Sequence, residues 1–199
     1  MSTLSRTFLL GTFAIGLFAG NAIATELRVR GEVTSINGDT VTVATPAGQA
    51  VDVTLSEPVV LYYRDIPLDD IDAGAYIAVP SIAMPDGTRQ ALGLVVFPEA
   101  MRGMNEGFKP WDLTAESKMT NATVAQVVSR GDERVLTVAY GEEEQTILVP
   151  EHAQVSTFAP APEIAVETGQ NVVIFADDSS GAIIGKFVGV HENGALPPV

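Results

Sequence analysis

Residues 29–53, VRGEVTSINGDTVTVATPAGQAVDV, have the same pattern of apolar and turn residues as residues 124–149, VAQVVSRGDERVLTVAYGEEEQTILV. In both stretches apolar residues alternate with polar ones, which is the period of a half-buried β-strand. The turn signals also correspond. Asn37-Gly38 is typical of a two-residue hairpin, and Arg130-Gly131-Asp132 takes its place in the second stretch. Matched apolar positions lie 95 to 97 residues apart. These two stretches therefore predict a duplicated unit of short strands.

The duplication extends outward to two segments, 25–97 and 121–192. Each holds five or six strand signals, with a turn-rich stretch before the last two that ends at Gly74 or Gly169. This order predicts an all-β protein made of two tandem small OB-like β-barrels, with an open six-stranded sandwich as the alternative. A domain of ~70 residues buries only ~60% of its chain surface. We therefore expect the two units to pack on each other, with 193–199 as a C-terminal tail.

The first 24 residues resemble a secretory signal peptide. Arg6 gives a positive start, residues 7–20 form a largely apolar run, and Ala22-Ile23-Ala24 is a small-x-small cleavage site. The run is too short to span ~30 Å of hydrocarbon as a helix. We expect cleavage before Thr25, a periplasmic location and no stable membrane insertion afterwards. An uncleaved anchor is the alternative.

Composition narrows the classes of partner. The chain has 25 acidic and 11 basic residues, a formal net charge of −14 and no Cys. Because nucleic-acid binding needs Lys and Arg to neutralise phosphates, the charge argues against a nucleic-acid partner. The absence of Cys is compatible with an oxidising compartment and means that no disulfide stabilises either unit.

Between the two units lies a connector of different composition, residues 98–120, which reads PEAMRGMNEGFKPWDLTAESKMT. Nothing in it alternates, and its Pro and Gly residues interrupt any helix. It holds the only Trp, Trp111, and three of the five Met residues. A connector this long is commonly functional or disordered, and its apolar residues favour packing across the barrels. We expect an ordered, irregular connector whose binding residues are Met101, Arg102, Phe108 and Trp111.

The string FPEAMRGMNEGFKPWDLTAESKMTNATV, residues 97–124, resembles the central signature of a bacterial family of exported proteins of unknown function. The matching elements are Phe-Pro-Glu, Met-Arg-Gly, Glu-Gly, Pro-Trp-Asp and Met-Thr-Asn-Ala-Thr-Val. Members often carry His between Glu-Gly and Pro-Trp-Asp, where this chain has Phe108 and Lys109. The resemblance implies two OB-type units and export, and it assigns no activity.

Thioethers in the connector suggest one kind of metal chemistry. Because Met selects soft cations, Cu(I) or Ag(I) could be held by Met101, Met104 and Met119, with His152 or Met84 in support and Trp111 as a lid. The alternative is that these Met residues fill gaps between connector and barrels. Without the metal, no cofactor is expected.

Catalytic motifs are sparse in the sequence. There are two His residues and no Cys, and no Gly-x-Ser-x-Gly elbow occurs. His191 is expected near a mobile C-terminus, where it would make a poor base. We therefore expect no catalytic residues.

The sequence favours an exported, non-enzymatic binding protein that contacts an envelope protein or a small ligand where the connector meets the barrels. The alternative is a periplasmic soft-metal-binding or metal-transport accessory protein.

Overall fold

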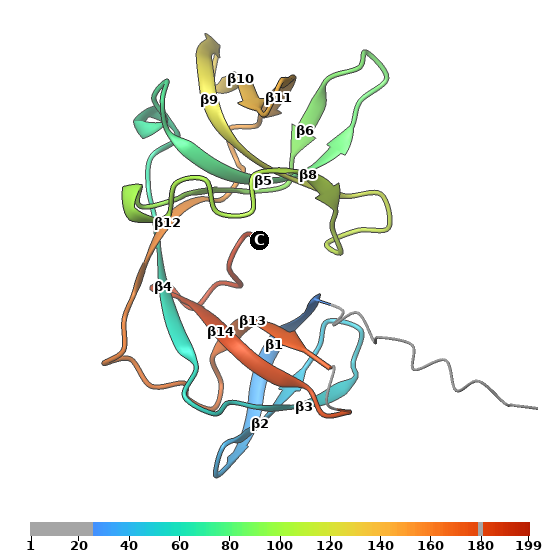
Figure 1. The fold of residues 1–199 in the computed structure, drawn as a ribbon, viewed down its shortest axis with the longest axis vertical. Coiled ribbons are helices and arrows are strands. Elements are labelled where there is room, and N and C mark those ends of the chain that lie inside the picture. Colours follow the sequence, from blue (N-terminus) through green and yellow to red (C-terminus); the bar gives the residue numbers. More distant parts are fainter. Residues whose placement is uncertain (1–25, 179–180) are drawn as a thin grey trace, which may run out of the picture.

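The computed structural model describes residues 26–178 and 181–199 and shows an all-β protein (Figure 1). The proposed signal peptide, residues 1–24, lies outside the described residues. The strands are β1 (Glu26–Asn37), β2 (Thr40–Ala44), β3 (Ala50–Thr54), β4 (Val59–Asp65), β5 (Tyr76–Ala83), β6 (Arg89–Ala91), β7 (Leu94–Val96), β8 (Gly107–Pro110), β9 (Lys118–Arg130), β10 (Glu133–Tyr140), β11 (Glu143–Val149), β12 (Val155–Pro160), β13 (Asn171–Asp177) and β14 (Ile184–His191). Two short 3₁₀ turns, η1 (Leu68–Asp70) and η2 (Glu99–Met101), interrupt them.

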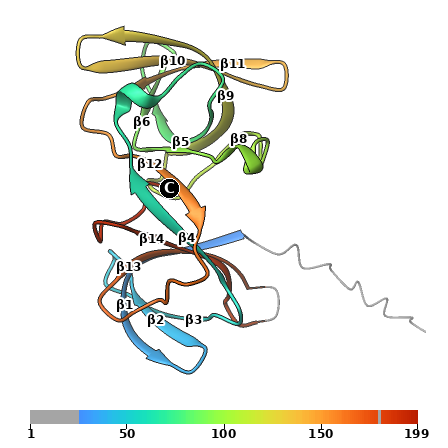
Figure 2. The same cartoon turned by 90° about the vertical axis from the view of Figure 1, so that its left-hand side faces the viewer.

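All described strands join one mixed sheet of 14 strands, which closes on itself twice. In the first circuit, β1 pairs with β2, β2 with β3, β3 with β14, β14 with β13, and β13 with β1. In the second circuit, β9 pairs with β10, β10 with β11, β11 with β6, β6 with β5, and β5 with β9. Each circuit has one parallel pair, β3–β14 or β11–β6. The two circuits lie at opposite ends of the molecule (Figures 1 and 2).

Each circuit is built from both repeats, which corrects the expectation that 25–97 and 121–192 close separately. The first circuit joins β1–β3 to β13 and β14, so blue and orange-red strands lie side by side (Figure 1). The second joins green β5 and β6 to yellow β9–β11. The reason is that β4 and β12 cross between the circuits instead of folding back. They pair with each other in antiparallel fashion, from Leu61–Pro160 to Asp65–Ser156.

The connector contains more regular structure than its sequence indicates. It was expected to be irregular over 98–120, yet it includes η2 and β8, and β9 already begins at Lys118. β8 forms because its backbone pairs with the free edge of β9, from Gly107–Asn121 to Pro110–Lys118. The strand β8 is stabilised by hydrogen bonds to a distant strand and not by its own sequence pattern, so the local periodicity does not predict it.

Three apolar clusters hold the fold together. Val33, Val43 and Ile174 lie in the core of the first circuit, and Ile77 and Leu136 lie in that of the second. The third cluster lies between the circuits and contains Leu61, Tyr63, Ala78, Val95, Trp111, Met119, Phe158 and Val199. Because neighbouring residues of a strand point to opposite faces, strands such as β5 are buried on both faces. In the third cluster, Ala78 of β5 and Met119 of β9 come from the outer face of the second circuit, and the other members come from β4, β7, β12, the connector and the tail.

The C-terminal tail runs into the space between the circuits (Figure 1). Pro197, Pro198 and Val199 are all buried. Gly93 makes room for the tail, because a Cβ there would lie 2.7 Å from the Pro198 Cβ. Gly189 instead makes room for neighbouring strands, because a Cβ there would lie 2.8 Å from the Tyr63 ring and 2.8 Å from the Val173 side chain. These glycines are 96 positions apart and so occupy equivalent places in the two repeats. The expectation of a mobile C-terminus beside His191 is wrong.

Candidate ligand pocket

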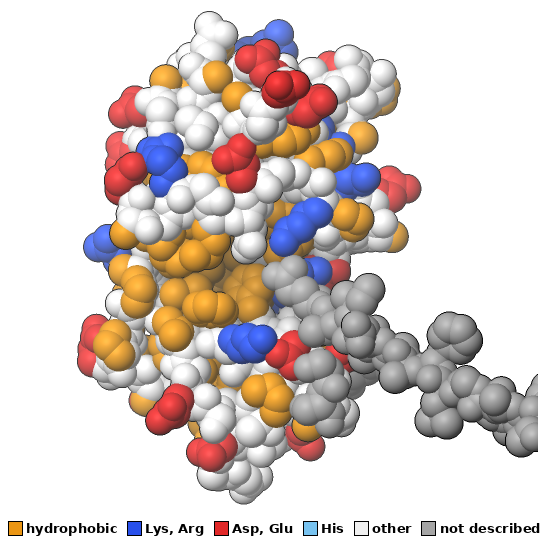
Figure 3. All heavy atoms as spheres, viewed as in Figure 1, with side chains coloured by type: hydrophobic (Ala, Val, Ile, Leu, Met, Phe, Trp, Pro, Cys, Tyr) orange, Lys and Arg blue, Asp and Glu red, His pale blue; other side chains and the backbone are white. Residues whose placement is uncertain are grey.

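An open apolar pocket lies between the two circuits, with a cavity volume of about 140 Å³. It shows as a hollow of apolar side chains at the waist of the molecule (Figure 3). The lining residues are Leu61, Tyr63, Ala78, Val95, Phe97, Met101, Met104, Asn105, Lys109, Trp111, Met119, Asn121, Phe158, Phe175, Phe187 and Val199. Residues from both circuits, the crossing strands, the connector and the tail all contribute, so the pocket exists only in the assembled fold.

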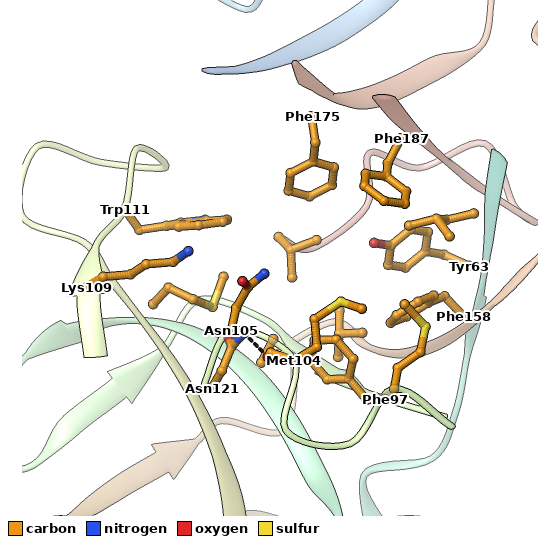
Figure 4. Close-up of a pocket in the computed structure, with 16 residues that line it drawn as sticks. Tyr63, Phe97, Met104, Asn105, Lys109, Trp111, Asn121, Phe158, Phe175 and Phe187 are labelled. Atoms are coloured by element: carbon orange, nitrogen blue, oxygen red, sulfur yellow. Dashed lines mark hydrogen bonds between the residues drawn. The ribbon is translucent and has the colours of Figure 1, made fainter. Parts of the chain in front are cut away.

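Six of the sixteen lining residues are aromatic. Phe175 and Phe187 enter from β13 and β14, Tyr63 and Phe158 from the crossing strands, and Trp111 from the connector (Figure 4). The Tyr63 and Phe158 ring centroids are 5.3 Å apart, and those of Phe97 and Phe158 are 5.4 Å apart. These distances are typical of favourable aromatic pairs. The rings therefore brace one another around the open space.

Trp111 is held against β1 by charged groups. The Arg28 guanidinium lies 4.0 Å from the centre of its ring. Asp112 Oδ1 accepts a hydrogen bond from Arg28 Nε at 2.9 Å and lies 3.0 Å from Arg30 Nη1. Burial opposes the charged form of Asp112, but the hydrogen bonds and charges of Arg30 and Arg28 together lower the pKa of this carboxyl. The Trp111-Asp112 pair thus ties the connector to the first circuit.

Replacing Asp112 with Asn is expected to cost about 1 kcal/mol at pH 7, which is less than buried charged hydrogen bonds contribute because the carboxylate is partly exposed. A lowered pKa in the folded state means that ionised Asp112 stabilises the fold above its ordinary value of 3.8, and that this stability is lost as pH falls through the lowered pKa. Urea unfolding from pH 7 to pH 2 should show the D112N and parent curves converging below about pH 4. A pH-independent difference would contradict the ion-pair assignment.

Three buried polar atoms at this site have no hydrogen-bond partner in the described structure: Arg30 Nη2, Trp111 Nε1 and Asn121 Oδ1. Their residues are 9%, 8% and 5% exposed. Asn121 and Trp111 line the pocket, and Arg30 lies beside Trp111 with its guanidinium 5.8 Å from the ring centre. Buried polar groups are nearly always paired, so each such atom calls for an explanation.

Two of the four expected binding residues line the pocket and two do not. Met101 and Trp111 lie in its wall. The Arg102 guanidinium instead bonds the Glu99 carboxylate and the Gly74 carbonyl. Phe108 packs against Tyr140, with the cations of Arg89 and Lys118 over its ring, outside the pocket. The alternation of β8 explains the position of Phe108, because Phe108 and the pocket-lining Lys109 point to opposite faces.

Of the four expected metal ligands, Met101, Met104 and Met119 all line the pocket. His152 lies exposed in the turn after β11 and is not part of the wall, and Met84 is not either. Within residues 26–178 and 181–199, no three His, Cys, Asp or Glu side chains are grouped to hold a metal ion. The connector thioethers thus converge without the imidazole that was expected to support them.

Several wall residues were not identified from the sequence, notably Tyr63, Phe97, Phe158, Phe175 and Phe187. A signal for Phe175 and Phe187 exists in the strands. Ile174 and Val188 fill the first core, so their neighbours Phe175 and Phe187 occupy the face that alternation assigns to solvent. Large aromatic residues on such a face indicate that something covers it.

His191, which was expected beside a mobile C-terminus, is part of a buried polar group. Its side chain is fully buried; Nε2 lies 3.2 Å from Ser156 Oγ and 3.1 Å from Asp65 Oδ1, and Nδ1 faces the Asn193 N–H at 3.4 Å. In a Ser-His-Asp triad the nucleophile and the carboxylate use different ring nitrogens. Here both use Nε2, and the group joins the ends of β4, β12 and β14. This geometry fits a structural role, in which the group holds the three strand ends together.

Comparisons with models of known protein families, with curated proteins and with solved structures give no match to this chain. The resemblance to an exported family therefore stays a prediction. Among the described residues, no helix has the length and apolar character that crossing a bilayer requires.

Proposed function

We propose that this protein is an exported, non-enzymatic binding protein that holds a small apolar ligand between its two circuits. The observation that carries the proposal is the open, aromatic-walled cavity of about 140 Å³. An engineered apolar cavity of ~150 Å³ accepts benzene, so a single ring or a branched aliphatic group is the size that fits here. Ligand sites are commonly apolar, with a few polar groups that fix orientation, and Asn105, Lys109 and Asn121 supply those groups.

Export and a two-barrel architecture are also part of this proposal. Arg6, the apolar run 7–20 and the Ala22-Ile23-Ala24 site favour export to the periplasm. The closed five-strand pairing with a single parallel neighbour pair in each circuit favours two OB-like barrels that exchange their last strands. Such a scaffold hosts many functions, so the pocket carries the functional argument.

Binding of toluene is expected to change the fluorescence of Trp111, the only Trp, because this ring lies in the pocket wall. Val199→Phe should abolish the change, since the larger side chain at this position of the wall fills the cavity. The matched control is Val128→Phe, at a position that is 48% exposed and outside the pocket. Titration of all three proteins checks the result.

Two outcomes would contradict the proposal. Toluene and related rings could fail to bind the parent protein at millimolar concentration, or V199F could bind them as well as V128F does. Thermal unfolding of V199F, compared with that of the parent, separates loss of the site from loss of the fold.

A second candidate function rests on one observation: Met101, Met104 and Met119 all line the cavity beside Trp111. Three thioethers are a ligand set that Cu(I) or Ag(I) prefers. On this alternative, Ag(I) quenches Trp111 fluorescence at one equivalent, and Met101→Leu with Met104→Leu removes the quenching. Unchanged fluorescence of the parent on addition of Ag(I) would dispose of the metal site without affecting the apolar-ligand proposal.

A further inference from the structure

We infer that the ligand of this pocket is a small carboxylic acid in its ionised form, with an apolar ring in the cavity and its carboxylate toward Trp111, Lys109 and Arg30. The inference rests on the proposed function, because it concerns the same cavity and names the class of ligand. It is carried by charge and by unpaired donors.

The charge of the pocket is opposite to that of the protein. Acidic residues outnumber basic ones 25 to 11 in the chain. Yet among the described residues that line the cavity, none is Asp or Glu and one, Lys109, is basic. The Lys109 ammonium lies 5.7 Å from the centre of the Trp111 ring, and the other face-stacking cations there are Arg28 and Arg30. Asp112 Oδ1 pairs with both of these arginines. Lys and Arg side chains border the apolar hollow (Figure 3).

Two unpaired donors belong to Trp111, in the pocket wall, and to Arg30, whose guanidinium lies 5.8 Å from the Trp111 ring centre. Trp111 Nε1 and Arg30 Nη2 are buried N–H donors without an acceptor in the described structure. A carboxylate has two oxygens and accepts from several donors, so it is the kind of group that both atoms lack, whereas a second cation offers no acceptor. The third unpaired atom, Asn121 Oδ1, is an acceptor and suits a donor on the ligand's ring or a bridging water.

The C-terminal residue Val199 already combines an apolar group and an oxygen acceptor at this corner of the pocket. Val199 puts an apolar side chain in the cavity wall, and its main-chain oxygen accepts a hydrogen bond from Arg30 Nε at 3.0 Å. An apolar group followed closely by an oxygen acceptor is thus compatible with this corner of the pocket. The remaining Arg30 donor, Nη2, is the one that the ligand would use.

Three planar probes of matched shape test the inference: benzoate, benzamide and benzamidinium. We expect benzoate to bind the full-length protein about tenfold more tightly than benzamide, as charge-assisted hydrogen bonds allow, and benzamidinium to bind most weakly. Binding is measured by calorimetry at ~0.15 M salt. Salt at this concentration screens the long-range field of the acidic surface, and that field by itself would favour benzamidinium.

Two variants and a control locate the effect. Lys109→Gln and Trp111→Phe should each reduce the benzoate-to-benzamide ratio at least about threefold, because each removes a donor and the second keeps an aromatic ring. Arg130→Gln makes the same charge change as K109Q at an exposed residue at the end of β9, outside the pocket, and should leave the ratio unchanged. Equal binding of the three probes, or preference for benzamidinium, overturns the inference and leaves the apolar-ligand proposal intact. If none of the three probes and no neutral ring binds, the proposed function fails with it.

Discussion

A fragment of residues 26–115, expressed alone, is expected not to form a folded monomer. It contains β1–β3 but lacks β13 and β14, which close the first circuit, and it contains β5 and β6 without β9–β11. Core residues such as Val33 and Ile77, fully buried in the whole chain, would lose one side of their packing. Since a small domain is marginally stable even when complete, we expect loss of cooperative unfolding.

Mixing this fragment with residues 116–199 should restore the fold, because the break falls in an exposed turn of the connector and every strand is then present. Near-UV circular dichroism reports side-chain packing, and size exclusion with light scattering reports stoichiometry; the intact chain is the control. A homodimer of 26–115 would also agree with exchange, because β5 and β6 of one copy could stand in for β13 and β14 of the other. A folded monomer of 26–115 would show that the repeat closes by itself and would contradict the exchange.

Local patterns in the sequence predicted the strands and turns but not their pairing. The turn between β1 and β2 is Gly38-Asp39, one residue later than the predicted Asn37-Gly38, because Asn37 ends β1 and pairs with Thr40. Gly141 lies in the two-residue turn between β10 and β11. Alternation of apolar and polar residues indicates which face of a strand is buried. It contains no information about which of two similar hairpins covers that face. Because the repeats resemble each other, both choices satisfy the same pattern, and the crossing of β4 and β12 decides between them.

The pocket was only partly predictable for the same reason. Trp111 and the three Met residues of the connector could be singled out by composition, and all four lie in the pocket wall. The opposite wall comes from β13 and β14, whose approach to the connector follows from the exchange. Phe108 was assigned to the site by its position in the connector, but the pairing of β8 with β9 points it elsewhere.

Replacing Trp111 with Ala is expected to lower the free energy of unfolding by about 3 kcal/mol, the low end for buried Trp because its ring already borders a cavity. For a chain of this length the melting temperature should fall by about 6 to 12 °C. Trp111 is 8% exposed and packs with Met119 and Val199 in the cluster between the circuits. The matched control is Phe108→Ala, in the same connector but 37% exposed, which should cost less than about 1 kcal/mol.

Similar losses for the two variants would show that Trp111 does not hold the circuits together. A double-mutant cycle sharpens the result, because Arg28 stacks on the Trp111 ring at 4.0 Å. Arg28→Ala, Trp111→Ala and the double variant should give a coupling energy of about 1 kcal/mol, as expected for a cation–π pair near the surface. Since Arg28 belongs to β1 and Trp111 to the connector, that coupling measures an attachment between the first circuit and the segment that edges the second. Additive losses would mean that Trp111 stabilises the fold only through its apolar contacts, and that the wall of the pocket is not anchored to β1 through this ring.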